Sequence, residues 1–104
     1  MRVTEYVIPL GENARKRHYL EAVKGKVTGF VVQMEVFHIG QWRAVVRYDS
    51  AHGVAHRHRY YLDGTQARAD VDLKFNEALM LADEDIKENW RIDQKAFFGG
   101  QIDD

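Results

Sequence analysis

The chain has 104 residues, 45% of them hydrophobic and 30% charged, and its formal net charge at pH 7 is −1. This length fits one hydrophobic core, so we expect residues 1–104 to form a single domain. The absence of cysteine excludes disulfides and thiolate metal sites, and no apolar run is long enough to span a membrane. The first residues lack the apolar core of a signal peptide, which predicts a cytoplasmic protein.

The small net charge hides an uneven distribution. Residues 1–62 contain ten Lys and Arg, five Asp and Glu, and all five histidines. Residues 63–104 contain five Lys and Arg against eleven Asp and Glu, so the two parts carry +5 and −6. Such a pattern favours either packing of the two parts against each other or an anionic partner on the basic part.

The first quarter of the chain predicts two strands. Val3–Ile8 is a short apolar run ended by Pro9, which is typical of a short or edge strand. Residues 10–16 are polar and predict a loop. A second strand is expected from Arg17 to Ala22, with a turn at Lys24-Gly25.

The clearest β pattern extends from about Lys26 to Phe37 and places Thr28, Phe30, Val32, Met34 and Val36 on one face. A three-residue loop at 38–40 is predicted to lead into the next strand. The expected register pairs Val36 with Trp42, Met34 with Ala44, Val32 with Val46, and Phe30 with Tyr48. This register gathers these eight side chains on the core face and sets Glu35 opposite Arg43 on the other.

A further strand is expected from about Ala55 to Leu62, ending at the Asp63-Gly64 turn. If Tyr60 and Leu62 continue the core face, His56 and His58 lie on that face too. The opposite face then carries Arg57, Arg59 and Tyr61 together with Arg43 and Arg47. The other register, which exchanges the two sets, stays open.

From Asp72 onward the apolar residues recur at helical spacing: Phe75, Leu79, Ala82, Ile86, Trp90 and Phe97. Asp72 is the expected N-cap and Gly99-Gly100 the expected stop of a helix of about 25 residues. Asn89 and Asp93 are polar residues within or beside its apolar stripe. The predicted fold class is α+β: a twisted antiparallel sheet of four to five strands packed by one long C-terminal helix.

The segment RYDSAHGVAHRHRYY, residues 47–61, contains three histidines and three arginines. His56 and His58 project from the same side of a strand, and two imidazoles can act as base and acid while Asp49 orients one of them. Arginines at this hairpin can hold phosphate groups through charge-assisted bonds. The predicted function is RNA binding or RNA cleavage, with anion contacts from Arg43, Arg47, Arg57 and Arg59.

Two other interpretations stay open. A ligand set of His52, His56, His58 and Asp49 is chemically sensible for zinc. However, a His-x-His pair more often hydrogen-bonds to backbone or tyrosine partners, so we predict no metal and no cofactor. The alternative function is a non-enzymatic interaction module, whose basic sheet face docks an acidic protein or a second copy of the chain.

Two segments, 42–64 and 75–90, resemble a family of small prokaryotic proteins of unknown function. The shared pattern is Arg-Tyr-Asp, Ala-His-Gly and His-Arg, then Asn-Glu-Ala and Asp-Ile-x-x-Asn-Trp. This resemblance implies a common fold and no activity. The hairpin is also similar to the TumE-like toxins of toxin–antitoxin pairs, which implies an acidic, antitoxin-like partner. The residues that carry this similarity are Tyr48, Asp49, Gly53, His56, Arg57 and His58.

Overall fold

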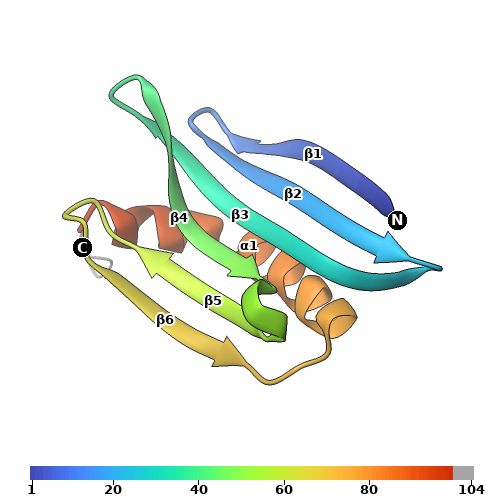
Figure 1. Cartoon of the computed structure of the whole chain (residues 1–104). Coiled ribbons are helices and arrows are strands. Elements are labelled where there is room, and N and C mark those ends of the chain that lie inside the picture. The colour runs from blue at the N-terminus through green and yellow to red at the C-terminus, as the bar shows by residue number, and fades with distance from the viewer. Residues whose placement is uncertain (100–104) are drawn as a thin grey trace.

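A computed structural model describes residues 1–99 of the chain as six antiparallel strands followed by one long helix (Figure 1). The strands pair in chain order, β1 to β6, as an open sheet. A short 3-10 turn, η1, connects β4 to β5. The elements are β1 (Arg2–Gly11), β2 (Ala14–Val23), β3 (Lys26–His38), β4 (Gln41–Asp49), η1 (Ala51–Gly53), β5 (Ala55–Tyr60), β6 (Gln66–Val71) and α1 (Phe75–Phe97).

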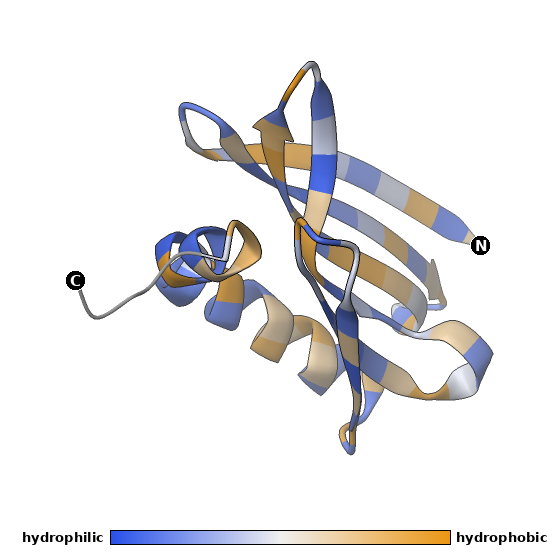
Figure 2. Cartoon of the chain, turned by 90° about the vertical axis from the view of Figure 1, so that its left-hand side faces the viewer, coloured by the Kyte–Doolittle hydropathy of each residue, from blue (hydrophilic) through white to orange (hydrophobic). Residues whose placement is uncertain are grey.

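The α+β class is confirmed, with α1 packed on one side of the sheet against β3, β4 and β5 (Figures 1 and 2). The opposite side, here called the open face, has no covering helix within residues 1–99. The predicted count of four to five strands is wrong because the sheet has six. Residues 10–16 form the ends of β1 and β2 around a tight turn instead of a loop, and β6 was not predicted.

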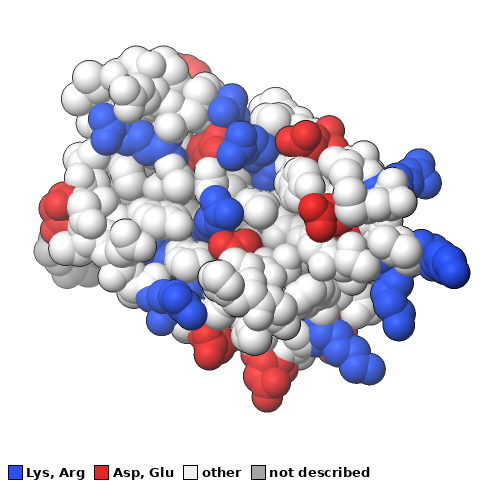
Figure 3. Space-filling model, viewed as in Figure 1, with Lys and Arg blue, Asp and Glu red and all other residues white. Residues whose placement is uncertain are grey.

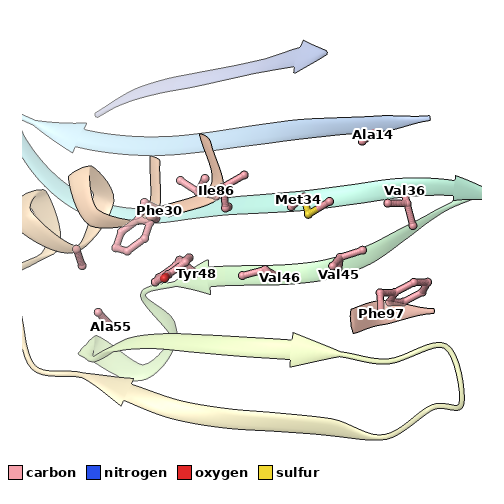
Figure 4. Packing of buried hydrophobic residues seen from close by; sticks show 13 residues of the cluster. Ala14, Phe30, Met34, Val36, Val45, Val46, Tyr48, Ala55, Ile86 and Phe97 are labelled. Atoms are coloured by element: carbon pink, nitrogen blue, oxygen red, sulfur yellow. The ribbon is translucent and has the colours of Figure 1, made fainter. Parts of the chain in front are cut away.

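The core face of β3 is confirmed for Phe30, Val32, Met34 and Val36, which are all buried. Thr28 was expected on this face but is exposed, because a bulge leaves it unpaired with β2. The four buried residues pack against Ala78, Ala82 and Ile86 of α1, with Phe97 closing the far end (Figure 4). Burial of this apolar surface holds the helix on the sheet. It thereby decides which side of every strand stays open.

The predicted register between β3 and β4 is wrong. The turn contains only two residues, Ile39 and Gly40, both at positive φ, and a bulge at Val45 then shifts the pairing. Met34 therefore pairs with Val46 and Val32 with Tyr48, while Trp42 pairs with Phe37 on the open face. Bulges of this kind insert one unpaired residue and are invisible to strict alternation. Here the bulge buries both Val45 and Val46.

The predicted orientation of β5 is also wrong, and the exchanged register is the correct one. Arg57 pairs with Tyr48 and Arg59 with Val46, so both arginines lie on the helix side. His56 pairs with Asp49 and His58 with Arg47 on the open face. The error came from Leu62, which lies beyond the end of β5 and is 40% exposed.

The helix begins two residues later than predicted, with Lys74 rather than Asp72 as its N-cap. The Glu77 carboxylate accepts a hydrogen bond from the Lys74 backbone amide, which caps the first turn. After Phe97, Gly99 adopts a positive φ of 74° and ends the helix as expected; Gly100 lies outside the described residues. No helix within residues 1–99 is long and apolar enough to cross a membrane.

Candidate functional site

The candidate site is a strip of polar and aromatic side chains that crosses the open face from β2 to β5. Paired residues on neighbouring strands bring it together: Arg17 with Gln33, Gln33 with Arg47, and Arg47 with His58. Facing residues of antiparallel strands share one face and lie close enough to interact. Asp49 and His56 form the adjacent pair.

Asp49 is the centre of the strip nearest η1. Its carboxylate is buried and accepts hydrogen bonds from Arg47 Nε at 2.8 Å and from the Ala51 backbone amide at 3.2 Å. His58 Nε2 lies 3.3 Å from the same carboxylate. Burial raises the pKa of Asp49, but these donors and the neighbouring positive charges outweigh it and leave that pKa below its usual value. Asp49 is therefore an anion that holds Arg47 and His58 in place.

His58 lies beside Asp49 on the open face, because β5 has the register opposite to the one expected. Its contact with Asp49 engages one ring nitrogen, and its side chain is 18% exposed. The ring stacks on Tyr60, with ring planes 11° apart. An imidazole fixed by a carboxylate on one side and open to solvent on the other can exchange protons with a ligand.

His56 has different surroundings. It is buried, and its Nδ1 lies 3.0 Å from Asp70 Oδ1 while its Nε2 lies 3.1 Å from the Ala51 carbonyl oxygen. Both partners are acceptors, so only the doubly protonated ring can donate both hydrogen bonds. His56 thus connects β6 and η1 to β5. Proton exchange between His56 and His58 stays a prediction, and in this geometry only His58 presents an uncommitted nitrogen.

The other half of the strip consists of arginines grouped around Glu35. Arg15 Nε lies 2.7 Å and Arg17 Nε 3.4 Å from this buried carboxylate, and Gln33 also donates to it. The Arg15 guanidinium lies 4.0 Å from the ring centroid of Trp42. Surface of Lys and Arg (blue) with surface of Asp and Glu (red) beside it is visible across the middle of this face (Figure 3).

Three of the four arginines predicted to line an exposed face do not lie there. Arg59 Nη1 forms a 2.9 Å ion pair with Asp93 of α1, and Arg57 Nε lies 3.9 Å from Asp85. Arg43 pairs with buried Val36, because the bulge changes the side of the sheet to which it points. Only Arg47 of the predicted set remains on the open face. An anion-binding role of the other three stays a prediction. It was based on one face shared by all four arginines, and the four do not share a face.

The predicted packing of the basic part against the acidic part is confirmed on the helix side. Lys16 and His18 of β2 contact Asp83, and Tyr48 donates a 2.5 Å hydrogen bond to Asp85. Burial, reinforced by the Lys16 ammonium, lowers the pKa of His18, although Asp83 acts in the opposite direction. Burial and the Asp85 carboxylate raise the pKa of Tyr48.

The possible zinc ligands do not assemble. His52 lies in η1 at a positive φ of 60° and is exposed, away from the ion-pair network of Asp49. Within residues 1–99, no group of three or more His, Asp or Glu side chains is placed to hold a metal ion.

Several residues of the strip were not identified from the sequence as site residues: Gln33, Glu35, Trp42 and Tyr60. Gln33 and Glu35 carried a usable signal, because they alternate with the core residues of β3. Arg15 and Arg17 were expected in a loop or at a strand start. On a strand, their alternation with Lys16 and His18 separates them onto the open face.

The comparisons with known proteins identify the family. The model of a domain of unknown function, DUF7718, matches residues 1–101. The chain belongs to the DUF7718 family. Neither the curated proteins nor the solved structures give a match. Membership agrees with the expected family of unknown function and brings no activity, and the TumE-like similarity of the hairpin stays an expectation.

Proposed function

We propose that this DUF7718 domain binds single-stranded RNA on the open face of its sheet. The observation that carries the proposal is the strip itself: three arginines, Arg15, Arg17 and Arg47, held by two carboxylates on an uncovered sheet. Glu35 and Asp49 offset two of the three positive charges, so the arginine cluster keeps a net charge of +1. At this cluster an anionic group is therefore favoured over a cationic one.

The arginines are suited to phosphate groups. Each contacts its carboxylate through Nε. A guanidinium has five N–H donors in a fixed plane, so this bond leaves donors for a second, charge-assisted contact. The carboxylates orient the side chains in advance, which lowers the entropy lost on binding.

The aromatic residues are suited to unstacked bases. Phe37 and Trp42 are 42% and 38% exposed on the open face, with ring centroids 5.3 Å apart. Tyr60 stacks beside His58 at the other end of the strip. Single-stranded nucleic acids bind basic surfaces on which aromatic rings stack with successive bases. An uncovered sheet face also fits an extended strand, whereas His56 and His58 line none of the five cavities described within residues 1–99.

Fluorescence anisotropy of a labelled 12-nucleotide RNA tests the proposal. We expect an affinity that falls steeply with salt, and a loss of about tenfold for Trp42→Ala, the usual effect of removing one stacking platform. Arg91→Gln, on the exposed side of α1, is the matched control for charge and should retain affinity. No binding at low salt, or equal losses for Trp42→Ala and Arg91→Gln, would contradict RNA binding on this face. Binding of acidic proteins instead of RNA would favour the interaction-module alternative.

RNA cleavage is a second candidate, favoured by the Asp49–His58 contact. In this reaction His58 would accept the proton of a 2′-hydroxyl as that oxygen attacks the adjacent phosphorus. The P–O bond to the 5′ oxygen would then break, with a proton delivered to the leaving oxygen from solvent or a second group. An RNA labelled at its 5′ end should be cut by the protein but not by His58→Ala, and the same sequence in DNA should stay intact. Cleavage by His58→Ala at the original rate would exclude this role.

A further inference from the structure

The N-terminal strand β1 forms one edge of the sheet and differs from the edge at the other end. It pairs with β2 on one side only, and no strand or helix covers its other side within residues 1–99 (Figure 1). All but one of its ten residues are exposed. An uncovered edge presents unpaired N–H and C=O groups that can template another strand.

The two edge strands are not equally protected against pairing. The opposite edge, β6, is only six residues long and has Arg68 and Asp70 in its centre. Short length and charge are the usual protection of an edge. In β1, the corresponding devices are one charge near its middle, Glu5, and Pro9 with a bulge between Pro9 and Gly11 at its C-terminal end. Residues 2–8 therefore remain a regular, accessible strand.

The exposed side chains of β1 are apolar on both sides of the sheet. Val3 and Val7 are 46% and 47% exposed and pair with Glu21 and Arg17 of the open face. Tyr6 and Ile8 are 46% and 40% exposed on the helix side, where α1 packs mainly on more distant strands. A new strand beside β1 would cover all four side chains and satisfy the backbone edge in one step.

We propose that the occupant of this edge is β1 of a second copy, paired antiparallel about a twofold axis. Between Arg2 and Gly11 the strand has one positive and one negative residue, Arg2 and Glu5, so charge does not select a basic or an acidic peptide. A twofold contact uses the same surface on both copies and closes without further growth. β1 meets this requirement because its apolar residues surround its centre.

The side chains also select a register. Facing residues must project to the same side of the joined sheet. The twofold axis can therefore lie beside an odd-numbered or an even-numbered residue, which then faces the same residue of the second copy. Pairing Glu5 with Glu5 of the second copy would set like charges face to face, which is unfavourable. Pairing Tyr6 with Tyr6 instead brings Thr4 opposite Ile8 and Val3 opposite Pro9. It retains every apolar residue of the strand within the paired segment.

In this dimer the two sheets become one, and both open faces lie on the same side because the axis is perpendicular to the sheet. The inference depends only on the edge strand and holds whether or not the open face binds RNA.

Sedimentation equilibrium of the purified chain tests the inference. We expect a concentration-dependent dimer that Val7→Lys converts to a monomer, and at concentrations where both proteins are monomeric their melting curves should agree, since Val7 is already half-exposed. The matched control Ala69→Lys, on the exposed edge β6, should leave the dimer intact. A monomer up to 200 µM, about the range of weak dimers, or a dimer lost equally in both variants, would overturn the inference.

A disulfide test locates the contact independently, because the chain has no cysteine of its own. Facing residues of antiparallel strands have Cα atoms within disulfide range. Mild oxidation of Tyr6→Cys should therefore give a disulfide-linked dimer, even at low protein concentration. Ala69→Cys is the control on β6. Cross-linking of Ala69→Cys but not Tyr6→Cys would overturn the assignment of the edge.

Discussion

The two faces of this sheet both carry arginines and carboxylates, yet the ion pairs are built differently. On the helix side they join the sheet to α1, as in Arg59–Asp93 and Lys16–Asp83. On the open face they join residues of the sheet to each other, as in Arg15–Glu35 and Arg47–Asp49. An ion pair between the sheet and α1 stabilises the packing of these two layers. An arginine whose ion pair lies within the uncovered sheet can still contact a ligand.

The largest expected difference between the faces concerns Asp93. This carboxylate is 4% exposed and pairs with Arg59, so Asp93→Ala leaves a largely buried guanidinium without its partner. We expect a loss of about 3 kcal/mol in the free energy of unfolding, measured by urea denaturation. Glu88→Ala, an exposed carboxylate on the same helix, should change it by less than about 0.5 kcal/mol. Equal effects of the two variants would show that Asp93–Arg59 does not stabilise the packing of α1.

A second difference separates the two histidines of β5. His56→Ala removes hydrogen bonds to Asp70 and Ala51 and should cost about 2 kcal/mol, at about 1 kcal/mol for each bond. His58→Ala should cost less than about 1 kcal/mol, because Asp49 keeps its bonds from Arg47 and Ala51. The same urea titrations give both values. A larger loss for His58→Ala would assign it a structural role.

The pH dependence of stability should come from the helix side. His18 has a lowered pKa because it is buried and lies near Lys16, while Asp83 partly opposes this and Tyr6 stacks on the ring. The unfolded chain therefore binds more protons than the folded one. The stability that His18 contributes is complete above pH 6.5, the ordinary pKa of histidine. It decreases as the pH falls from 6.5 towards the lowered pKa of His18 in the folded chain. His18→Gln should flatten the change in urea midpoint between pH 7.5 and 5.5. An unchanged slope would contradict this assignment, and His52→Ala is the exposed control.

Sequence patterns predicted the parts of the fold in which apolar residues alternate or recur clearly. The core face of β3 and the stripe of α1 were of this kind, and so was the edge character of β1. The patterns failed in strands whose two faces carry equally polar residues. In β5, histidine and arginine alternate, so the pattern cannot tell which set faces the core, and buried Ala55 gave too small a signal.

The candidate site could be predicted only in part for the same reason. The place of Arg47 on the open face was predicted, whereas the contact between Asp49 and His58 required the correct side of β5. The position of Trp42 on the open face depends on the bulge at Val45, which a single sequence does not reveal. Asp93 was noted as a polar residue within or beside the apolar stripe of the helix, and Arg59 was predicted as an anion contact. Their pairing required the correct side of β5.

The most direct test of the account compares Arg47→Gln with Arg59→Gln, one arginine from each face. Arg47→Gln should lower RNA affinity about tenfold, as for loss of a charged hydrogen bond, and should destabilise the fold less than Arg59→Gln, because Asp49 keeps its contacts with Ala51 and His58. Arg59→Gln should destabilise the fold and leave the RNA affinity of the folded protein intact. The opposite assignment of the two losses, or equal losses of affinity, would contradict the central claim that the open face alone is the binding surface.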